Sequence, residues 1–413
     1  DLTWTLTWGQ LLLNYVGHGS NRDWGHEYIM KFEDIQSLSN QHLPLWVTAT
    51  CDFSRFDSYN VSGGEAALKN PKGGAIALLS TVRTVYIANN DSMSTNVYKN
   101  IFERDNGKSL RFGDIIRKSK LSFSVNDENK VRFLLLGDPA LRLAYPDNTY
   151  KVKVAAINGT DISSSDTLTF SALSRVKISG QVIDASNNLA SDFTGKVSCA
   201  IFDALQDVKT RDNGGDGSIF QYKNYLNTIY SGTVDVQNGV FDCEFVVPND
   251  IAYTSNHGKM SFYAWEGQGR AAQGSFYAYK VNGTDVAGAA DASGPQIDAL
   301  YLNSASFVPG ATVTTTPTFH VVPRDETGIN LSSGLGHTIN LLVDGKAQYD
   351  VTSYFVSTGS SSKEGYIEYT LPELAEGIHN LRFTVWDVNN NCSVQDVGFR
   401  VTDDSKSYAS EFS

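Results

Sequence analysis

Two short apolar runs near the start of the chain have the pattern of buried strands. The first covers Leu11 to Val16, and the second covers Leu43 to Thr50. Short apolar runs that are bounded by Gly or Pro and contain β-branched residues are typical of strands covered on both faces. Between them, Lys31 to Asn40 fits a short helix. One face of this helix carries Phe32, Ile35 and Leu38. A strand, a helix and a strand in this order predict a right-handed parallel crossover.

The alternation of strand and helix patterns continues to about Pro146. Ser62 with Glu65 three residues later makes a capping box, so we interpret Glu65 as a helix cap rather than a catalytic acid. The other elements expected here are a helix that ends near Lys69, a strand at Ala75–Ser80, amphipathic helices at Ser92–Arg104 and Asp114–Leu121, and a last strand at Phe133–Leu136. Met93, Val97 and Ile101 form the apolar stripe of the longer helix. Residues 1–146 are therefore expected to form an α/β domain with a parallel sheet.

From Tyr150 onward the helical periodicity disappears, and short alternating runs recur between Gly, Asn and Asp turns. This pattern favours two all-β, immunoglobulin-like sandwiches, at residues 147–290 and 291–413. Gly283 to Gly294 is interpreted as the linker between them, and Asp403 to Ser413 as a loose polar tail. The strands expected in the two sandwiches are Lys177–Val182, Lys196–Phe202, Gly232–Val236, Val240–Val246, Lys259–Trp265 and Ser275–Val281, then Ile297–Leu302, Thr318–Val322, His337–Val343, Gly365–Leu371, Gly377–Asp387 and Val394–Val401.

Each of the first two apolar runs is followed by a reactive side chain. His18 lies between two glycines after the first run, and Cys51 directly follows the second. Open α/β sheets bind ligands at the carboxyl ends of their strands, and a nearby imidazole favours the reactive thiolate of a cysteine. The amides of Gly19 and Cys51 would then donate to a developing oxyanion. A structural role stays open as the alternative, because a buried Cys usually acts as a small apolar residue.

Composition narrows the choice of function. The 413 residues have room for two to four domains, and the net charge of −12 argues against a nucleic-acid partner. The sequence contains no apolar run of about 18 residues, so no membrane span is predicted. No signal peptide is recognised at its start. Only Asp1 to Gln10 precede the strand that carries His18, so we expect the chain to begin inside a domain, with Thr3 to Trp8 as a displaced strand or a junction.

The four cysteines do not predict a metal site. They include no CxxC pair, which argues against zinc. Cys199 and Cys243 fall in two strands of one expected sandwich, so a disulfide between them stays open. Asp387, Asn389 and Asn391 have the spacing of a calcium loop but lack its glycine and closing carboxylate, so we interpret them as a hairpin turn. We expect no metal and no cofactor.

The motifs around His18 and Cys51 resemble the gingipain family of cysteine peptidases. They are Gly17-His18-Gly19 and Thr48-Ala49-Thr50-Cys51-x-Phe53-x-x-Phe56-Asp57, with the two reactive residues 33 positions apart (51 − 18). Further support comes from the segments at residues 62–65, 72–77 and 135–143 and from the β-rich remainder. Within the family, the sequence is most similar to the gingipain-like sortases of type IX secretion. The resemblance implies a caspase-like catalytic domain, of which residues 1–146 are the C-terminal part.

Residues in the loops near His18 and Cys51 are candidates for supporting roles. Asp23 and Glu27, in the loop from Ser20 to Tyr28, are candidates to orient the imidazole, although a solvated loop charge is the alternative for each. The family takes this carboxylate from upstream sequence, which is not present before Leu11. Trp24 and Glu27 are candidate substrate-binding residues in the same loop, which would roof the site. Arg83 and Tyr86, in the loop after the third strand, are candidates for the pocket of the residue before the scissile bond. Arg83 favours a small, neutral or acidic residue there.

For the whole protein, the resemblance implies a sortase on the outer surface of the cell, associated with the outer membrane. It would remove the C-terminal sorting domain of secreted cargo proteins and attach the cargo to an anionic lipopolysaccharide. The implied partners are the outer-membrane β-barrel PorV, together with PorZ and PorQ. Two other functions stay open: a surface adhesin or scaffold without catalysis, and a plain secreted cysteine endopeptidase.

Overall fold

A computed structural model describes residues 2–402, except residues 8, 125–126, 148, 163–166, 213–214, 216, 253, 268, 287–290, 333–335 and 360. The expected tail from Asp403 to Ser413 lies outside the described residues. The chain divides into two compact units, Asp1–Asn148 and Thr149–Ser413. Among the described residues, no helix is both long and apolar enough to cross a membrane.

The first unit is a sheet of four strands covered on both faces by helices. The strand order is β1-β2-β3-β6, for strands Leu12–Val16, Leu45–Ala49, Ala77–Thr81 and Phe133–Leu136. The first three strands are parallel, as the crossover pattern predicted. The expectation of a wholly parallel sheet is wrong in one place, since β6 pairs antiparallel to β3. The chain between β3 and β6 passes through α4, the β4–β5 hairpin, α5 and α6, and α6 ends directly before β6.

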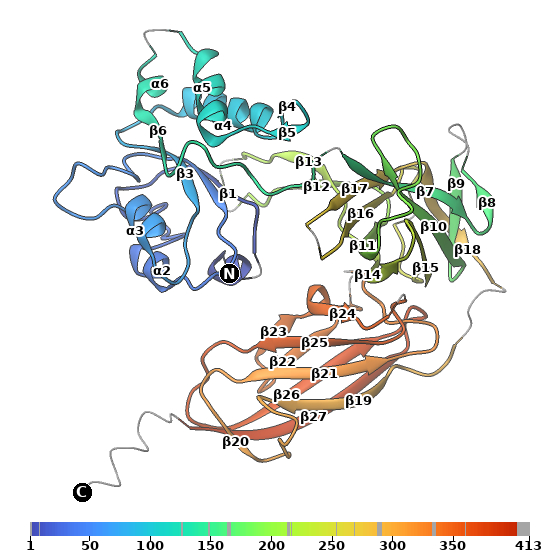
Figure 1. The fold of residues 1–413 in the computed structure, drawn as a ribbon. Helices are drawn as coiled ribbons and strands as arrows, with labels where there is room; N and C mark the ends of the chain where they lie inside the picture. The colour runs from blue at the N-terminus through green and yellow to red at the C-terminus, as the bar shows by residue number, and fades with distance from the viewer. Residues whose placement is uncertain are drawn as a thin grey trace, which may run out of the picture. The chain divides into compact units, whose positions relative to one another are not determined.

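Figure 1 shows α2 and α3 on one side of this sheet and α4 and α5 on the other. The period of two along β2 explains this arrangement, because alternate side chains point to opposite faces. Trp46 packs into the core beneath α2 and α3, whereas Leu45, Val47 and Ala49 pack beneath α4 and α5. The helices are α1 (Leu2–Thr7), α2 (Phe32–Ser37), α3 (Gly63–Lys69), α4 (Ile87–Ile101), α5 (Phe112–Leu121) and α6 (Glu128–Arg132), and a hairpin of β4 (Arg104–Asp105) and β5 (Lys108–Ser109) joins α4 to α5.

Local signals predicted most of these elements. The capping box is confirmed, because Ser62 Oγ accepts from Glu65 N and the Glu65 carboxylate accepts from Ser62 N. The stripe of α4 is confirmed as well, since Met93, Val97 and Ile101 are fully buried. Two expectations differ from the structure. Thr3 to Trp8 was expected to be a strand or a junction, but Leu2–Thr7 forms α1, with Leu6 buried.

The second difference is the start of α4, which begins at Ile87 rather than near Ser92. The Asn129 side chain fixes this start. Its Oδ1 accepts from Tyr86 N at 3.1 Å and its Nδ2 donates to Tyr86 O at 2.9 Å. Asn129 lies in α6, 43 residues away in the chain, so local sequence gave no sign of this contact.

The first β-module of the second unit is one eight-stranded sheet around a single core. Its order is β14-β11-β16-β17-β7-β10-β15, with β8 paired to β7. Two separate hydrogen-bonded sheets were expected here, but the parallel bridge between β17 and β7 joins them into one. Its strands are β7 (Tyr150–Ile157), β8 (Thr160–Asp161), β10 (Arg175–Asp184), β11 (Gly195–Phe202), β14 (Thr228–Val236), β15 (Val240–Val246), β16 (Lys259–Trp265) and β17 (Ala271–Phe276).

Two small sheets accompany this module: β9 (Leu168–Ala172) with β18 (Tyr279–Thr284), and β12 (Gln206–Lys209) with β13 (Gln221–Asn224). The strand expected at Ser275–Val281 is divided between β17 and β18, because Tyr279 N donates to Tyr277 O and turns the chain. β18 also extends into the expected linker. Cys199 and Cys243 are buried in the same core as free thiols.

The second β-module has two sheets around one core and is a β-sandwich. The sheets have the orders β19-β21-β25-β24 and β20-β27-β26-β22-β23. Their strands are β19 (Gln296–Leu302), β20 (Thr312–Val313), β21 (Thr318–Arg324), β22 (Asn340–Val343), β23 (Ala347–Asp350), β24 (Phe355–Ser357), β25 (Gly365–Thr370), β26 (Gly377–Trp386) and β27 (Cys392–Val401), with a 3-10 helix at Thr352–Tyr354. The hairpin interpretation of Asp387 to Asn391 is confirmed, because the Asp387 carboxylate accepts from the backbone of Asn389 and Asn391 between paired β26 and β27. The immunoglobulin-like assignment of both modules stays a prediction.

Candidate functional site

Strands β1 and β2 bring the segments of His18 and Cys51 to the same edge of the sheet. Their parallel register pairs Val16 with Ala49, and Gly17 N donates to Ala49 O at 3.3 Å. His18 and Cys51 each follow a residue of the last pair by two positions. Both therefore leave the carboxyl end of the sheet from adjacent strands.

Cys51 lies against the loop that follows β3. Its side chain is half-buried and packs on the core beneath α4 and α5, and its Sγ donates to Val85 O at 3.7 Å. The next residue, Asp52, has a positive φ of 56° and donates from its backbone N to Arg83 O. The loop after β3 therefore contacts Cys51 and the residue that follows it.

The backbone at His18 is held from two directions. The phenol of Tyr15 donates to His18 O at 2.6 Å, and Gly25 N donates to the same oxygen at 2.8 Å. Tyr15 in turn stacks on Trp24, with ring centroids 4.6 Å apart and an angle of 5°. In the described part of the chain, the imidazole of His18 has no hydrogen-bond partner, and its ring neighbour is His26, at 6.0 Å between centroids.

Gly19 packs directly against the segment of the cysteine. A β-carbon at residue 19 would lie 2.3 Å from Thr50 Oγ1 and 3.0 Å from Asp23 O, so only glycine fits. Neither Gly19 N nor Cys51 N donates a hydrogen bond within the described residues. Both amides are thus unpaired among the described residues, and their role as oxyanion donors stays a prediction.

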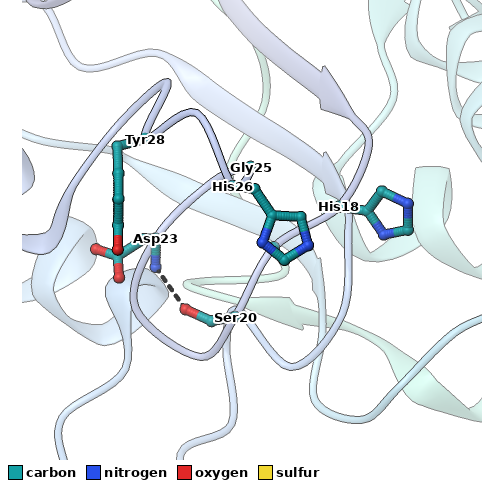
Figure 2. A pocket seen from close by; sticks show the side chains of 7 residues that line it. His18, Ser20, Asp23, Gly25, His26 and Tyr28 are labelled. Carbon is teal, nitrogen blue, oxygen red and sulfur yellow. Dashed lines mark hydrogen bonds between the residues drawn. The ribbon is translucent and has the colours of Figure 1, made fainter.

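A pocket of about 230 Å³ opens beside His18. It is lined only by the loop after β1, at residues 18–20, 23, 25, 26 and 28. Figure 2 shows His26 next to His18 and, elsewhere around the pocket, Asp23 and Tyr28. His26 was not among the residues predicted for the site. A second histidine eight positions after His18 in the same polar loop was the signal that could have found it.

The structure places the two candidate carboxylates differently. Oδ1 of Asp23 accepts from Phe32 N at 2.8 Å, so this side chain helps to hold the start of α2. Glu27 is exposed and lies near Tyr15: burial, and then the negative charge of Glu27, raise the pKa of the Tyr15 phenol. No hydrogen bond joins either carboxylate to His18 within the described residues.

The other three candidates also have defined surroundings. Trp24 is 1% exposed and packs against Trp46 and Phe53, so its ring belongs to the core and offers no surface to a substrate. Arg83 forms an ion pair with Asp57 on the loop that follows Cys51. The ring of Tyr86 is exposed, and the Arg132 guanidinium lies over it at 5.5 Å.

Comparison with known proteins identifies similar chains. Residues 1–144 match the family model for peptidase family C25. The crystal structure of dimeric latent PorU from Porphyromonas gingivalis is 34% identical, with a TM-score of 0.40, over 74% of this chain and 29% of that chain. The complex of the pro- and mature domains of RgpB from Porphyromonas gingivalis is 16% identical, with a TM-score of 0.33, over 68% of this chain and 56% of that chain. Comparison with curated proteins gave no match.

Proposed function

Because residues 1–144 belong to peptidase family C25, and the chain is similar to PorU and the gingipains, we propose that Cys51 and His18 are the catalytic pair of a cysteine peptidase that acts as a sortase. One observation carries this proposal. The parallel pairing of β1 with β2 brings the segment of His18 against that of Cys51, with Gly19 in contact with Thr50. The chain spans 29% of the length of PorU, so the sortase activity is a proposal.

The chemistry follows from the two side chains. The thiol of Cys51 gives its proton to His18, and the sulfur attacks the carbonyl carbon of the scissile peptide bond. The amides of Gly19 and Cys51 stabilise the oxyanion, and removal of one such donor typically costs about 10²- to 10³-fold in rate. The imidazolium then protonates the leaving amine, which leaves an acyl group on the sulfur.

The sequence resemblance supports the further steps. We propose that the substrate is the bond before the C-terminal sorting domain of a secreted cargo protein, and that an amine of an anionic lipopolysaccharide resolves the thioester. The proposed setting is the outer surface of the cell, with PorV, PorZ and PorQ as partners. The loop of Arg83 and Tyr86, which reaches Cys51, would bind the residue before the scissile bond.

The test is the processing of cargo in cells that carry Cys51→Ala, with Cys392→Ala as the matched control. We expect Cys51→Ala to leave the sorting domain on the cargo and Cys392→Ala to process it normally. Normal processing by Cys51→Ala would exclude the catalytic role and favour a scaffold or adhesin. Processing with release of free cargo and no lipopolysaccharide conjugate would favour a plain endopeptidase.

A further inference from the structure

The pocket beside His18 is separate from the loop that contacts Cys51. All its lining residues come from the loop after β1, whereas the thiol contacts Val85 in the loop after β3. In a thiol–imidazole pair, the imidazole protonates the leaving amine and later takes the proton from the incoming nucleophile. A cavity on the imidazole side of such a pair is therefore positioned for these two groups rather than for the acyl part of the substrate.

The lining chemistry suits an amine. One carboxylate oxygen of Asp23 accepts from Phe32 N, and the other has no hydrogen-bond partner among the described residues. The imidazole of His26 is exposed and makes no hydrogen bond there either. Tyr28 is 59% exposed; Lys31 Nζ lies over its ring at 5.2 Å from the centroid, and its hydroxyl makes no hydrogen bond among the described residues. The free Asp23 oxygen, a neutral His26 ring and the Tyr28 hydroxyl can each accept a hydrogen bond, and a neutral primary amine donates two.

The size of the pocket limits what enters it. Its volume of about 230 Å³ is below the roughly 300–1,000 Å³ of sites for drug-sized ligands. It admits one amine-bearing group, such as a single amino acid or amino sugar, and leaves the rest of a large acceptor outside.

We propose that this cavity, the acceptor pocket, binds the primary amine that resolves the thioester on Cys51. The inference deepens the proposed function and rests on it. The amine nitrogen attacks the thioester carbonyl carbon, so a C–N bond forms and the C–S bond breaks. The proton lost from nitrogen passes to His18 and then to the departing thiolate, which restores the thiol. His26 and Tyr28 hold the amine during this step.

The pocket is tested by the competition between an amine and water for an acyl-enzyme. The full chain is acetylated with p-nitrophenyl acetate in the presence of glycinamide, and the ratio of N-acetylglycinamide to acetate is measured per p-nitrophenol released. This ratio is independent of a general loss of activity. The variants are His26→Gln and Tyr28→Asn, since asparagine tolerates the positive φ of 54° at residue 28. The matched controls are His42→Gln and Tyr59→Asn, at exposed positions outside the pocket.

We expect the ratio to saturate with glycinamide in the unsubstituted chain and to fall about three- to tenfold in each pocket variant, as for loss of one hydrogen bond to the bound amine. The control variants should keep the original ratio. An unchanged ratio in both pocket variants, or a linear rise with glycinamide in the unsubstituted chain, overturns the acceptor pocket. The saturation measurement does not depend on the folding of any variant. If the chain forms no acetyl-enzyme at Cys51, the proposed function itself is contradicted. This result is distinct from the two results that overturn the acceptor pocket.

Discussion

Arg83 and Asp57 form a two-point ion pair that ties the loop after β3 to the loop after Cys51. Nη1 of Arg83 lies 3.0 Å from one carboxylate oxygen, and Nη2 lies 2.5 Å from the other. The guanidinium that we considered for substrate recognition thus already has an acidic partner within the protein. An acidic substrate residue would have to compete with Asp57 for Arg83.

The first prediction concerns pH. The hydrogen bond and charge of Arg83 hold the pKa of Asp57 below its ordinary value of 3.8. Because the folded-state value is the lower one, the ion pair is fully formed above pH 3.8 and is lost as the pH falls through the folded-state pKa. Carboxyl-carbon NMR of Asp57 should show this depressed titration, and Arg83→Met should return it to the ordinary range. Equal titration in both proteins would contradict the pairing.

The second prediction concerns the close contact between Gly19 and Thr50. Gly19→Ala places a methyl group 2.3 Å from Thr50 Oγ1, so the two segments must separate. Overpacking of this kind typically costs about 1–3 kcal/mol. We expect a loss of this size in denaturant unfolding and a loss of acyl transfer. Gly267→Ala is the control, since no atom lies within 4 Å of the added carbon. Unchanged acyl transfer in Gly19→Ala would contradict the proposed role of the Gly19 amide as an oxyanion donor.

The third prediction concerns the phenol under His18. Tyr15→Phe removes the hydrogen bond to His18 O but keeps the stack on Trp24. We expect a loss of about 0.5–1.5 kcal/mol in stability, together with a lower kcat at an unchanged KM for the acyl donor, because the imidazole loses its fixed position. Tyr59→Phe, at a fully exposed site, is the control. A change in KM alone would place the role of Tyr15 in substrate binding.

The fourth prediction concerns the four thiols. Cys199 and Cys243 are neighbours in one core, and the hydrogen bond that the Cys199 thiol donates to Cys243, followed by burial, raises the pKa of Cys199. Burial also raises the pKa of Cys392. At about pH 6 in iodoacetamide, an imidazole-assisted thiolate reacts and ordinary thiols do not. We expect labelling at Cys51 alone, its loss in His18→Ala, and protection of Cys199 and Cys243 until unfolding. Equal labelling of Cys51 with and without His18 would contradict the activation of this thiol by His18.

The sequence predicted the parts of the site that depend on local pattern. Two apolar runs with a helix between them were enough to place His18 and Cys51 at one sheet edge, and the spacing of Ser62 and Glu65 was enough for the capping box. Each of these follows from residues close together in the chain, where periodicity and hydrogen-bond geometry act directly.

The parts that the sequence did not predict depend on distant contacts. Asn129 moves the start of α4 to Ile87, and Asp57 pairs with Arg83 26 positions away. Trp24 was expected to face the substrate because its loop is polar, but the aromatic cluster with Trp46 and Phe53 draws it into the core. His26 lies beside His18 because the loop folds back through Gly25. None of these partners is adjacent in sequence.

The burial of Trp24 has a consequence for how specificity can change in related chains. The buried indole anchors the middle of the loop after β1 in the core, and the hydrogen bond from Gly25 N to His18 O joins the two parts of the loop on either side of it. Because Gly25 N also holds His18 O, we expect exchange of residues 26–28 alone, with Gly25 kept, to change the proposed acceptor pocket while the backbone at His18 stays in place.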